Sequence, residues 1–274
     1  MIAVIDSGLR ATHEDAGQWK QKKGYDYIRG IEVLPGQSID SGCDGGHGTH
    51  VTTIAAGDTH NGQGIAGAGF NSGILPMRAI SGDANNDCKV WNSQTRDWPI
   101  RWSRLNGAHI VNMSYKFDGP DPDEESVMAE SWANGVTPVT GAANDNTDYN
   151  AGGRRYPCAY LYVVCVGANN NSGTRCGNSG FGSSWVDFSA PAQNARGASS
   201  ASDTSYTYDP CATSYATPLV SGAMALLRSL GHGPQAPVRG DRLYGAEQRL
   251  DDLGRAPRGT CPMAVERLHK EVFR

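Results

Sequence analysis

The sequence has no apolar run as long as a membrane span and no strong excess of either charge. The net charge is −4 and the pI is about 6.0, so we expect neither nucleic acid nor an anionic membrane surface as a partner. A membrane-spanning helix would need about 20 consecutive apolar residues. No CxxC pair occurs among the seven cysteines, which argues against a zinc site.

The length and composition are those of one sizeable α/β core. The chain has 274 residues, and its 35 glycines fit many tight turns. Seven cysteines indicate an oxidising compartment, and their odd number leaves at least one thiol unpaired. Met1 leads directly into an apolar stretch rather than a signal peptide. We therefore expect a secreted monomer whose targeting and pro-segments are missing from this sequence.

A serine stands at the start of a predicted helix in the last third of the chain. Small and polar residues precede Ser214, and an apolar run at helical spacing follows it at 219–227. The free N–H groups and the positive end of a helix favour an oxyanion, which forms when a hydroxyl attacks a carbonyl. Ser214 is therefore a candidate nucleophile, although serine also commonly caps buried helices.

Two further motifs stand earlier in the chain. An apolar strand ends in the motif DSG, which begins with Asp6, and the motif HGTHV begins with His47. Asp, His and Ser in this order, each in its own motif, resemble the subtilisin-like serine proteases (subtilases, peptidase family S8), for which this order is known. The resemblance covers roughly residues 1–230. It implies that Ser214 attacks, that His47 is the general base, and that Asp6 orients His47.

The predicted fold is α/β, with a mostly parallel twisted sheet flanked by helices, as in subtilisin. We expect its strands at residues 1–6, 74–80, 109–114, 136–143 and 161–168. Residues 1–231 form the predicted catalytic domain, from which an N-terminal segment is missing. Residues 232–274 are a C-terminal extension with no assigned function.

The resemblance also assigns an oxyanion donor and a substrate surface. By position, Asn144 would donate its side-chain N–H to the developing oxyanion together with the backbone N–H of Ser214; the alternative is an ordinary turn asparagine. Polypeptides are the expected substrates. The residues that the resemblance places beside them are Ser114, Tyr115, Lys116, Ala142, Ala143 and Arg155.

Arg155 bears on specificity because it stands where subtilisins usually carry a small residue at the far end of the S1 pocket. A guanidinium facing inward would match a carboxylate, and acidic P1 residues would then be preferred. In one alternative, Arg155 points outward with Arg154 as a solvated charge. In another, Asp145 or Asp148 neutralises Arg155 and the preference stays broad.

Four positions depart from the family pattern. The motif after His47 is one residue shorter around Thr52, Pro138 interrupts an expected interior strand, and Ala143 and Ala212 replace glycines. These departures support an alternative function, that of a catalytically impaired or truncated relative that acts as a non-enzymatic protein. An esterase of the α/β-hydrolase type is a third reading, but its GxSxG motif does not occur.

The motif GxGxxG at residues 62–67 has no strand before it and no helix after it, so we reject a dinucleotide site. The segment resembles the calcium loop of the family instead. The catalytic chemistry requires no cofactor, and a structural Ca²⁺ is the ligand that the resemblance implies. Another ligand of the family, near its N-terminus, has no counterpart here, so a loop without calcium stays open. The matching ligands are the Asp15 carboxylate, the Asn61 side-chain oxygen and the carbonyls of Thr59, Gln63 and Ile65.

The cysteines allow one pairing to be predicted. Cys43 precedes the His47 helix and Cys88 follows the strand that ends near Ile80, so both loops should lie at the active-site edge of the sheet. We therefore predict a Cys43–Cys88 disulfide. Cys165 lies in an apolar core strand and is the predicted free buried thiol.

Overall fold

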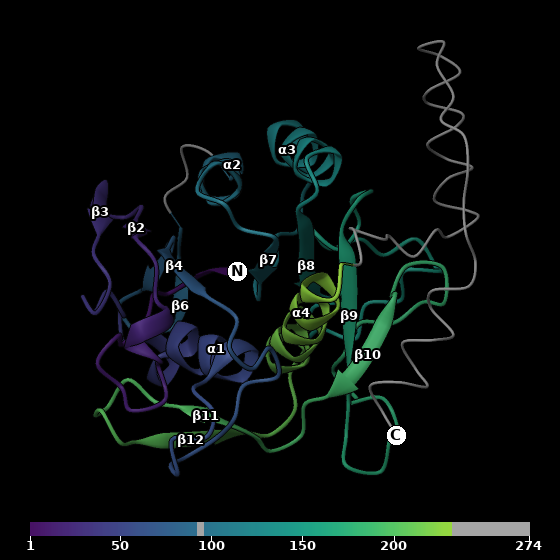
Figure 1. Cartoon of the computed structure of the whole chain (residues 1–274). Coiled ribbons are helices and arrows are strands. Elements are labelled where there is room, and N and C mark those ends of the chain that lie inside the picture. Colours follow the sequence, from purple (N-terminus) through teal and green to yellow (C-terminus); the bar gives the residue numbers. More distant parts are fainter. Residues whose placement is uncertain (92–95, 232–274) are drawn as a thin grey trace.

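The computed structural model describes residues 1–91 and 96–231 of the chain. Its centre is an eight-stranded sheet, shown in Figure 1. In chain order the strands of this sheet are β1 (Ile2–Asp6), β2 (Gly24–Asp26), β3 (Ile31–Val33), β4 (Ile74–Arg78), β7 (Ile110–Met113), β8 (Thr137–Gly141), β9 (Val164–Asn169) and β10 (Phe188–Pro191).

The strands follow the spatial order β10-β9-β8-β7-β1-β4-β2-β3. Every pairing is parallel except that between β2 and β3. The predicted α/β fold with a mostly parallel sheet is therefore confirmed. Strands β1, β4, β7, β8 and β9 are the five that the sequence predicts, with ends that differ by at most three residues. The short strands β2, β3 and β10, at or near the two edges, were not predicted.

Helices cover both faces of the sheet. Figure 1 shows α2 (Asp97–Leu105) and α3 (Pro122–Ala133) on one side and α1 (His47–Ala56) with α4 (Thr213–Ser229) on the other. Alternation along β1 explains this arrangement, because successive side chains of a strand point to opposite faces. Ile2 and Val4 join the buried apolar cluster that contains α1 and α4 residues, whereas Ala3 and Ile5 join the cluster with α2 and α3 residues.

Smaller elements complete the described chain. Two antiparallel hairpins lie outside the main sheet: β5 (Ile80–Gly82) with β6 (Cys88–Trp91), and β11 (Ala195–Ala198) with β12 (Tyr206–Asp209). Two short 3₁₀ helices are η1 (Gln18–Lys20) and η2 (Cys43–Gly45). Among the described helices, none is long and apolar enough to cross a membrane.

Pro138 does lie in an interior strand, β8, yet it removes no ladder bond. The N–H of Thr137 bonds to the carbonyl of His109, on the β7 side. Because the direction alternates along a strand, the nitrogen of Pro138 faces the β9 side. Pairing of β8 with β9 begins only at Val139. The proline is therefore compatible with the sheet.

Three disulfides close loops around the sheet: Cys43–Cys88, Cys158–Cys165 and Cys176–Cys211. The first confirms the predicted pair, with Cα atoms 5.2 Å apart. The prediction that Cys165 is the free thiol is wrong, because the turn before β9 brings Cys158 to a Cα distance of 5.0 Å. An apolar position in a core strand therefore does not exclude a disulfide. Cys261 and the predicted extension 232–274 lie outside the described residues.

Candidate active site

Asp6 and His47 meet at the carboxyl edge of the sheet. Asp6 is the last residue of β1 and is fully buried, and His47 is the first residue of α1. Oδ1 of Asp6 accepts a 2.7 Å hydrogen bond from the N–H of Ser7 and lies 2.8 Å from Nδ1 of His47. The second ring nitrogen of His47, Nε2, is then left for another partner.

The surroundings of His47 favour its protonated form. Burial lowers the pKa of the imidazole, but the charge of Asp6 and its hydrogen bond raise it, with support from Asp44 and Asp209. The net result is a pKa above the ordinary value. A histidine in this setting is stabilised when it takes up a proton, which a general base requires.

Ser214 lies in the first turn of α4 and is tied to the end of β7. Its hydroxyl donates a 3.3 Å hydrogen bond to the carbonyl of Ser114, and the hydroxyl of Ser114 donates a 3.0 Å bond to the carbonyl of Ser214. Within residues 1–91 and 96–231, no hydrogen bond joins Ser214 to His47. The start of α4 nevertheless lies beside that histidine, since the ring of Tyr215 is 5.8 Å from the His47 ring.

Asn144 is held by the residue that precedes Ser214. Its Oδ1 accepts from the backbone N–H of Thr213 at 2.8 Å and from the Thr213 hydroxyl at 3.1 Å. With the oxygen fixed in this way, the amide nitrogen is directed away from Thr213. Thr213 was not predicted from the sequence, although its hydroxyl next to the candidate nucleophile was a signal.

The backbone around these residues shows how two of the glycine replacements are accommodated. Ala143 has a φ of 69°, in the left-handed region that costs a non-glycine residue about 1–2 kcal/mol. Ala212 has a φ of −142°, which any residue adopts. The shortened motif around Thr52 forms an unbroken helix. Of these three departures from the family pattern, Ala143 is the one that introduces backbone strain.

The two segments expected to contact substrate lie side by side. Phe117 and Tyr156 exchange backbone hydrogen bonds of 2.7 and 2.9 Å, which join the stretch after β7 to the loop before β9. The first stretch carries Ser114, Tyr115 and Lys116, and Arg155 lies on the second. Ala142 and Ala143 follow β8 and are buried.

Four charged side chains also join these two segments. Oδ2 of Asp145 accepts from Nε of Arg155 at 2.6 Å and from Nζ of Lys116 at 3.1 Å. Asp118 lies 2.9 Å from Lys116 and 3.4 Å from Arg155. Burial raises the pKa of Asp145, but hydrogen bonds from Thr147, Arg155 and Lys116 outweigh it and lower the pKa to about 2. Asp145 therefore pairs with Arg155, and this pairing is one of the alternatives that the sequence left open for Arg155.

Comparisons with known proteins identify the family. The profile described as the subtilase family matches residues 1–237. The chain belongs to the subtilase family. This subtilase is 34% identical over 230 residues to a thermophilic serine proteinase of Bacillus sp. (strain AK1), covering 84% of this chain and 52% of the relative. It is 29% identical to subtilisin Savinase of Lederbergia lenta, covering 83% of this chain and 75% of the relative.

Solved structures show the same likeness. A cold-adapted subtilisin-like serine proteinase matches with a TM-score of 0.68 at 27% identity, covering 85% of this chain and 76% of that one. Fervidolysin from Fervidobacterium pennivorans, described as a keratinolytic enzyme related to subtilisin, matches with a TM-score of 0.71 at 25% identity, covering 84% and 36%. This subtilase spans about half the length of the first curated relatives it matches.

Four of the five residues expected to bind calcium come together, but their donor groups do not fit a cation. Oδ1 of Asp15 accepts from the side-chain N–H of Asn61 at 2.7 Å, and Oδ2 accepts from the backbone N–H of Ile65 at 2.8 Å. The Asn61 oxygen accepts from the N–H of Gln63 at 3.1 Å. Thr59, the fifth expected ligand, donates its N–H to Asp58 at 3.1 Å. Among the described residues there is also no group of three or more His, Cys, Asp or Glu side chains that could hold a metal. A calcium ion would need oxygens in place of these N–H groups.

His50, one turn after His47, has a structural role. Its Nε2 lies 3.1 Å from the carbonyl of Ala195 and its Nδ1 lies 3.3 Å from Asp209. Its ring also packs against Tyr215, with centroids 4.4 Å apart. His50 therefore joins α1 to the β11–β12 hairpin and to α4, and it fixes the helices that carry His47 and Ser214.

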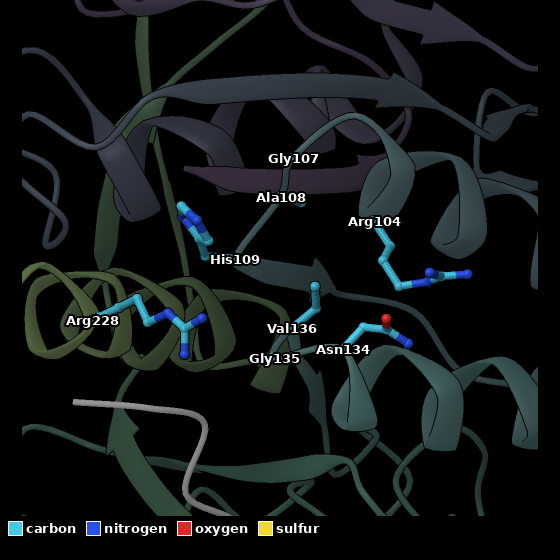
Figure 2. Close-up of a pocket in the computed structure, with 8 residues that line it drawn as sticks. All are labelled: Arg104, Gly107, Ala108, His109, Asn134, Gly135, Val136 and Arg228. Atoms are coloured by element: carbon cyan, nitrogen blue, oxygen red, sulfur yellow. The ribbon is translucent and has the colours of Figure 1, made fainter. Parts of the chain in front are cut away.

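A hollow lies at the end of the sheet where the parallel strands begin, and it is separate from this site. It is formed by residues just before β7 and β8 and by the last turns of α2 and α4, as Figure 2 shows. Arg104 pairs with Glu130 at 2.6 Å and points away from His109 and Arg228. No residue of the candidate active site lines the hollow. Its lining residues are Arg104, Gly107, Ala108, His109, Asn134, Gly135, Val136 and Arg228.

Proposed function

We propose that this subtilase is a serine endopeptidase that hydrolyses peptide bonds through an acyl-enzyme. The observation that carries the proposal is the 2.8 Å contact between buried Asp6 and His47, with the first turn of α4 beside them. Relatives at 34% and 29% identity are named a serine proteinase and a subtilisin. Because these relatives are named as proteases, a non-enzymatic function is the less favoured alternative.

Nucleophilic attack requires the Ser214 hydroxyl to turn from the Ser114 carbonyl toward His47. His47 then takes the hydroxyl proton on Nε2 as Oγ attacks the substrate carbonyl carbon. Asp6 accepts the Nδ1–H hydrogen bond, so it fixes the ring and stabilises the imidazolium that forms. The pKa of His47 is raised because Asp6 stabilises the protonated ring in this way.

The tetrahedral oxyanion needs donors that are in place before the reaction. The Asn144 amide is oriented by Thr213, so its N–H₂ group is available to the oxyanion. The N–H of Ser214 lies in the first turn of α4, where helical N–H groups have no intrahelical partner. Loss of one such donor costs roughly 10²–10³ in kcat, the magnitude measured in subtilisin.

Collapse of this intermediate completes acylation. His47 returns its proton to the leaving amine, which breaks the C–N bond and leaves the acyl group on Ser214. Water then attacks the acyl-enzyme by the same route, with His47 as base, and releases the acid. No metal or cofactor takes part in these steps.

The substrate backbone is expected to add as an extended strand along residues 114–116, because main-chain hydrogen bonds give affinity for any sequence. Arg155 lies beside this surface but is paired with Asp145. We therefore propose a broad, uncharged P1 preference in place of an acidic one. Three disulfides, and relatives such as the minor extracellular protease Epr of Bacillus subtilis, support secretion. We further propose that the chain acts as a monomer.

Hydrolysis of a peptide with phenylalanine at P1 tests the proposal. We expect Ser214→Ala and His47→Ala each to lower kcat by about 10⁶, and the double variant to lose little more, because the two act as a unit. Ser229→Ala, on the exposed end of the same helix, is the matched control and should keep full activity. Equal activity of the wild type and Ser214→Ala would overturn the assignment of Ser214, and no activity in either would leave the non-enzymatic function.

A further inference from the structure

The loop that connects α1 to β4 is closed by a buried lysine. Lys20 is 3% exposed, and its Nζ donates to the carbonyls of Gly57 and Phe70, each at 3.1 Å. Nζ also lies 3.8 Å from Asp58. Lysine is almost never fully buried unless it is paired. One ammonium group therefore binds both ends of loop 57–70.

The middle of loop 57–70 is held by Asp15. Its two carboxylate oxygens face three groups: the Asn61 amide at 2.7 Å, the N–H of Ile65 at 2.8 Å and the phenol of Tyr206 at 2.6 Å. The Tyr206 oxygen also lies 2.8 Å from Oε1 of Glu14, so the two carboxylates share its one O–H. Tyr206 belongs to β12, so this contact also ties the loop to the β11–β12 hairpin. A carboxylate that accepts several N–H and O–H donors is satisfied without a cation.

A second cation of the chain takes another loop carbonyl. The guanidinium of Arg196 stacks 4.3 Å from the Tyr206 ring, and its Nη1 donates to the carbonyl of Gly64 at 3.3 Å. Gly64 is packed closely against the same groups, since a Cβ added to it would lie 1.8 Å from the Tyr206 oxygen and 2.0 Å from Oδ2 of Asp15. The loop backbone, Tyr206 and Asp15 are therefore in direct contact.

We propose that Lys20 and Arg196 replace a metal ion in loop 57–70, so that this loop folds without calcium. The charges are arranged as the inverse of a calcium site. Side-chain cations bind the loop carbonyls, and the carboxylate binds N–H and O–H donors. For an ion to bind, the N–H of Ile65 would have to turn away and Tyr206 would have to leave Asp15. This inference does not depend on the catalytic activity.

Thermal unfolding with and without calcium tests the inference. The Ser214→Ala chain is the parent, because it removes self-digestion if the chain is a protease. We expect its Tm to differ by less than about 1 °C between EDTA and millimolar CaCl₂. A calcium site at a thousandfold excess of ion over its dissociation constant would instead raise Tm by roughly 8–16 °C.

Asp15→Asn in the same parent locates any effect of calcium. We expect it to lower Tm by a few degrees, equally in EDTA and in calcium, because it replaces an acceptor by a second amide donor. Asp203→Asn is the matched control, since the exposed Asp203 side chain bonds to Arg10 and Thr12 and, among the described residues, to no group of loop 57–70. If Asp15→Asn does not fold, Tyr206→Phe removes one of the three donors and leaves the ring in place.

Terbium luminescence gives a direct readout of an ion at this place. Tb³⁺ binds calcium sites, and Tyr206 would sensitise its emission from contact distance. We expect the parent to give no more emission than Asp15→Asn. A calcium shift in Tm that Asp15→Asn retains would place the ion elsewhere and support the inference. The inference would be overturned if Asp15→Asn abolished a calcium-dependent shift in Tm or a Tb³⁺ signal. It would also be overturned if the Tm of Asp15→Asn equalled that of the parent.

Discussion

Asp145→Asn should make this subtilase accept acidic P1 residues better. The carboxylate of Asp145 holds both Arg155 and Lys116. Together with Asp118 the group has two positive and two negative charges. Replacing Asp145 by asparagine leaves one uncompensated positive charge beside the expected P1 site. A glutamate side chain at P1 would then gain an attractive partner.

The size of this gain follows from exposure. The side chains of Arg155, Asp145 and Lys116 are 29%, 28% and 40% exposed, so solvent screens them. Ion pairs of this kind contribute about 0.2–1 kcal/mol. At the upper end, 1 kcal/mol corresponds to about fivefold in kcat/KM. Added salt should reduce the gain, because the charges are near the surface.

The assay compares kcat/KM for matched peptides with glutamate and phenylalanine at P1. We expect the Glu/Phe ratio to rise up to about fivefold in Asp145→Asn and to return when Arg155→Gly is added. Arg155→Gly alone leaves one uncompensated negative charge in the group, so it should lower the ratio by up to about the same factor. Asp148→Asn removes a charge from the same loop without touching either cation and is the control. An unchanged ratio in Asp145→Asn would refute the reasoning.

Three further predictions concern stability and pH. Glu124 is fully buried, and burial raises its pKa to about 7 from 4.5; the folded state therefore holds this proton more tightly, and stability should fall by about 3 kcal/mol as pH rises through that window. Urea unfolding should show Glu124→Gln without this slope, and an identical slope would contradict the burial argument. Ala143→Gly should raise stability by up to about 1 kcal/mol by relieving the left-handed backbone; a lower Tm would exclude strain there. Activity needs a neutral His47, so kcat/KM should fall with decreasing pH at a pKa above 6.5, and Asp6→Asn should move this limb to lower pH; a wild-type limb below 6.5 would count against the Asp6 effect.

The sequence was most informative where one segment determines its own structure. Strands β1, β4, β7, β8 and β9 are apolar runs, and short-range pattern is enough to find them. The motifs of Asp6 and His47 end a strand and begin a helix, so their meeting at one edge of a parallel sheet follows from topology. The Cys43–Cys88 disulfide followed from the same topology.

The remaining features depend on which groups the folded loops bring together. Whether Arg155 is free or paired is decided by Asp145, ten residues away in the chain. The Asn61 amide and the Ile65 N–H decide whether Asp15 is a calcium ligand or a hydrogen-bonded carboxylate. Their direction depends on Tyr206, which comes from β12. Cys165 was mispredicted because the turn that brings Cys158 to it has no apolar periodicity. Side-chain partners of this kind are set by tertiary packing.

The most direct test of the central claim is to locate a fluorophosphonate adduct by peptide mass spectrometry. Such reagents react with a serine that a neighbouring base activates. The account predicts a single adduct on Ser214, absent from Ser214→Ala, strongly slowed in His47→Ala, and unchanged in Ser229→Ala. An adduct on a different serine, or labelling of Ser214 that is as fast without His47 as with it, would contradict the assignment of Ser214 as nucleophile and His47 as base.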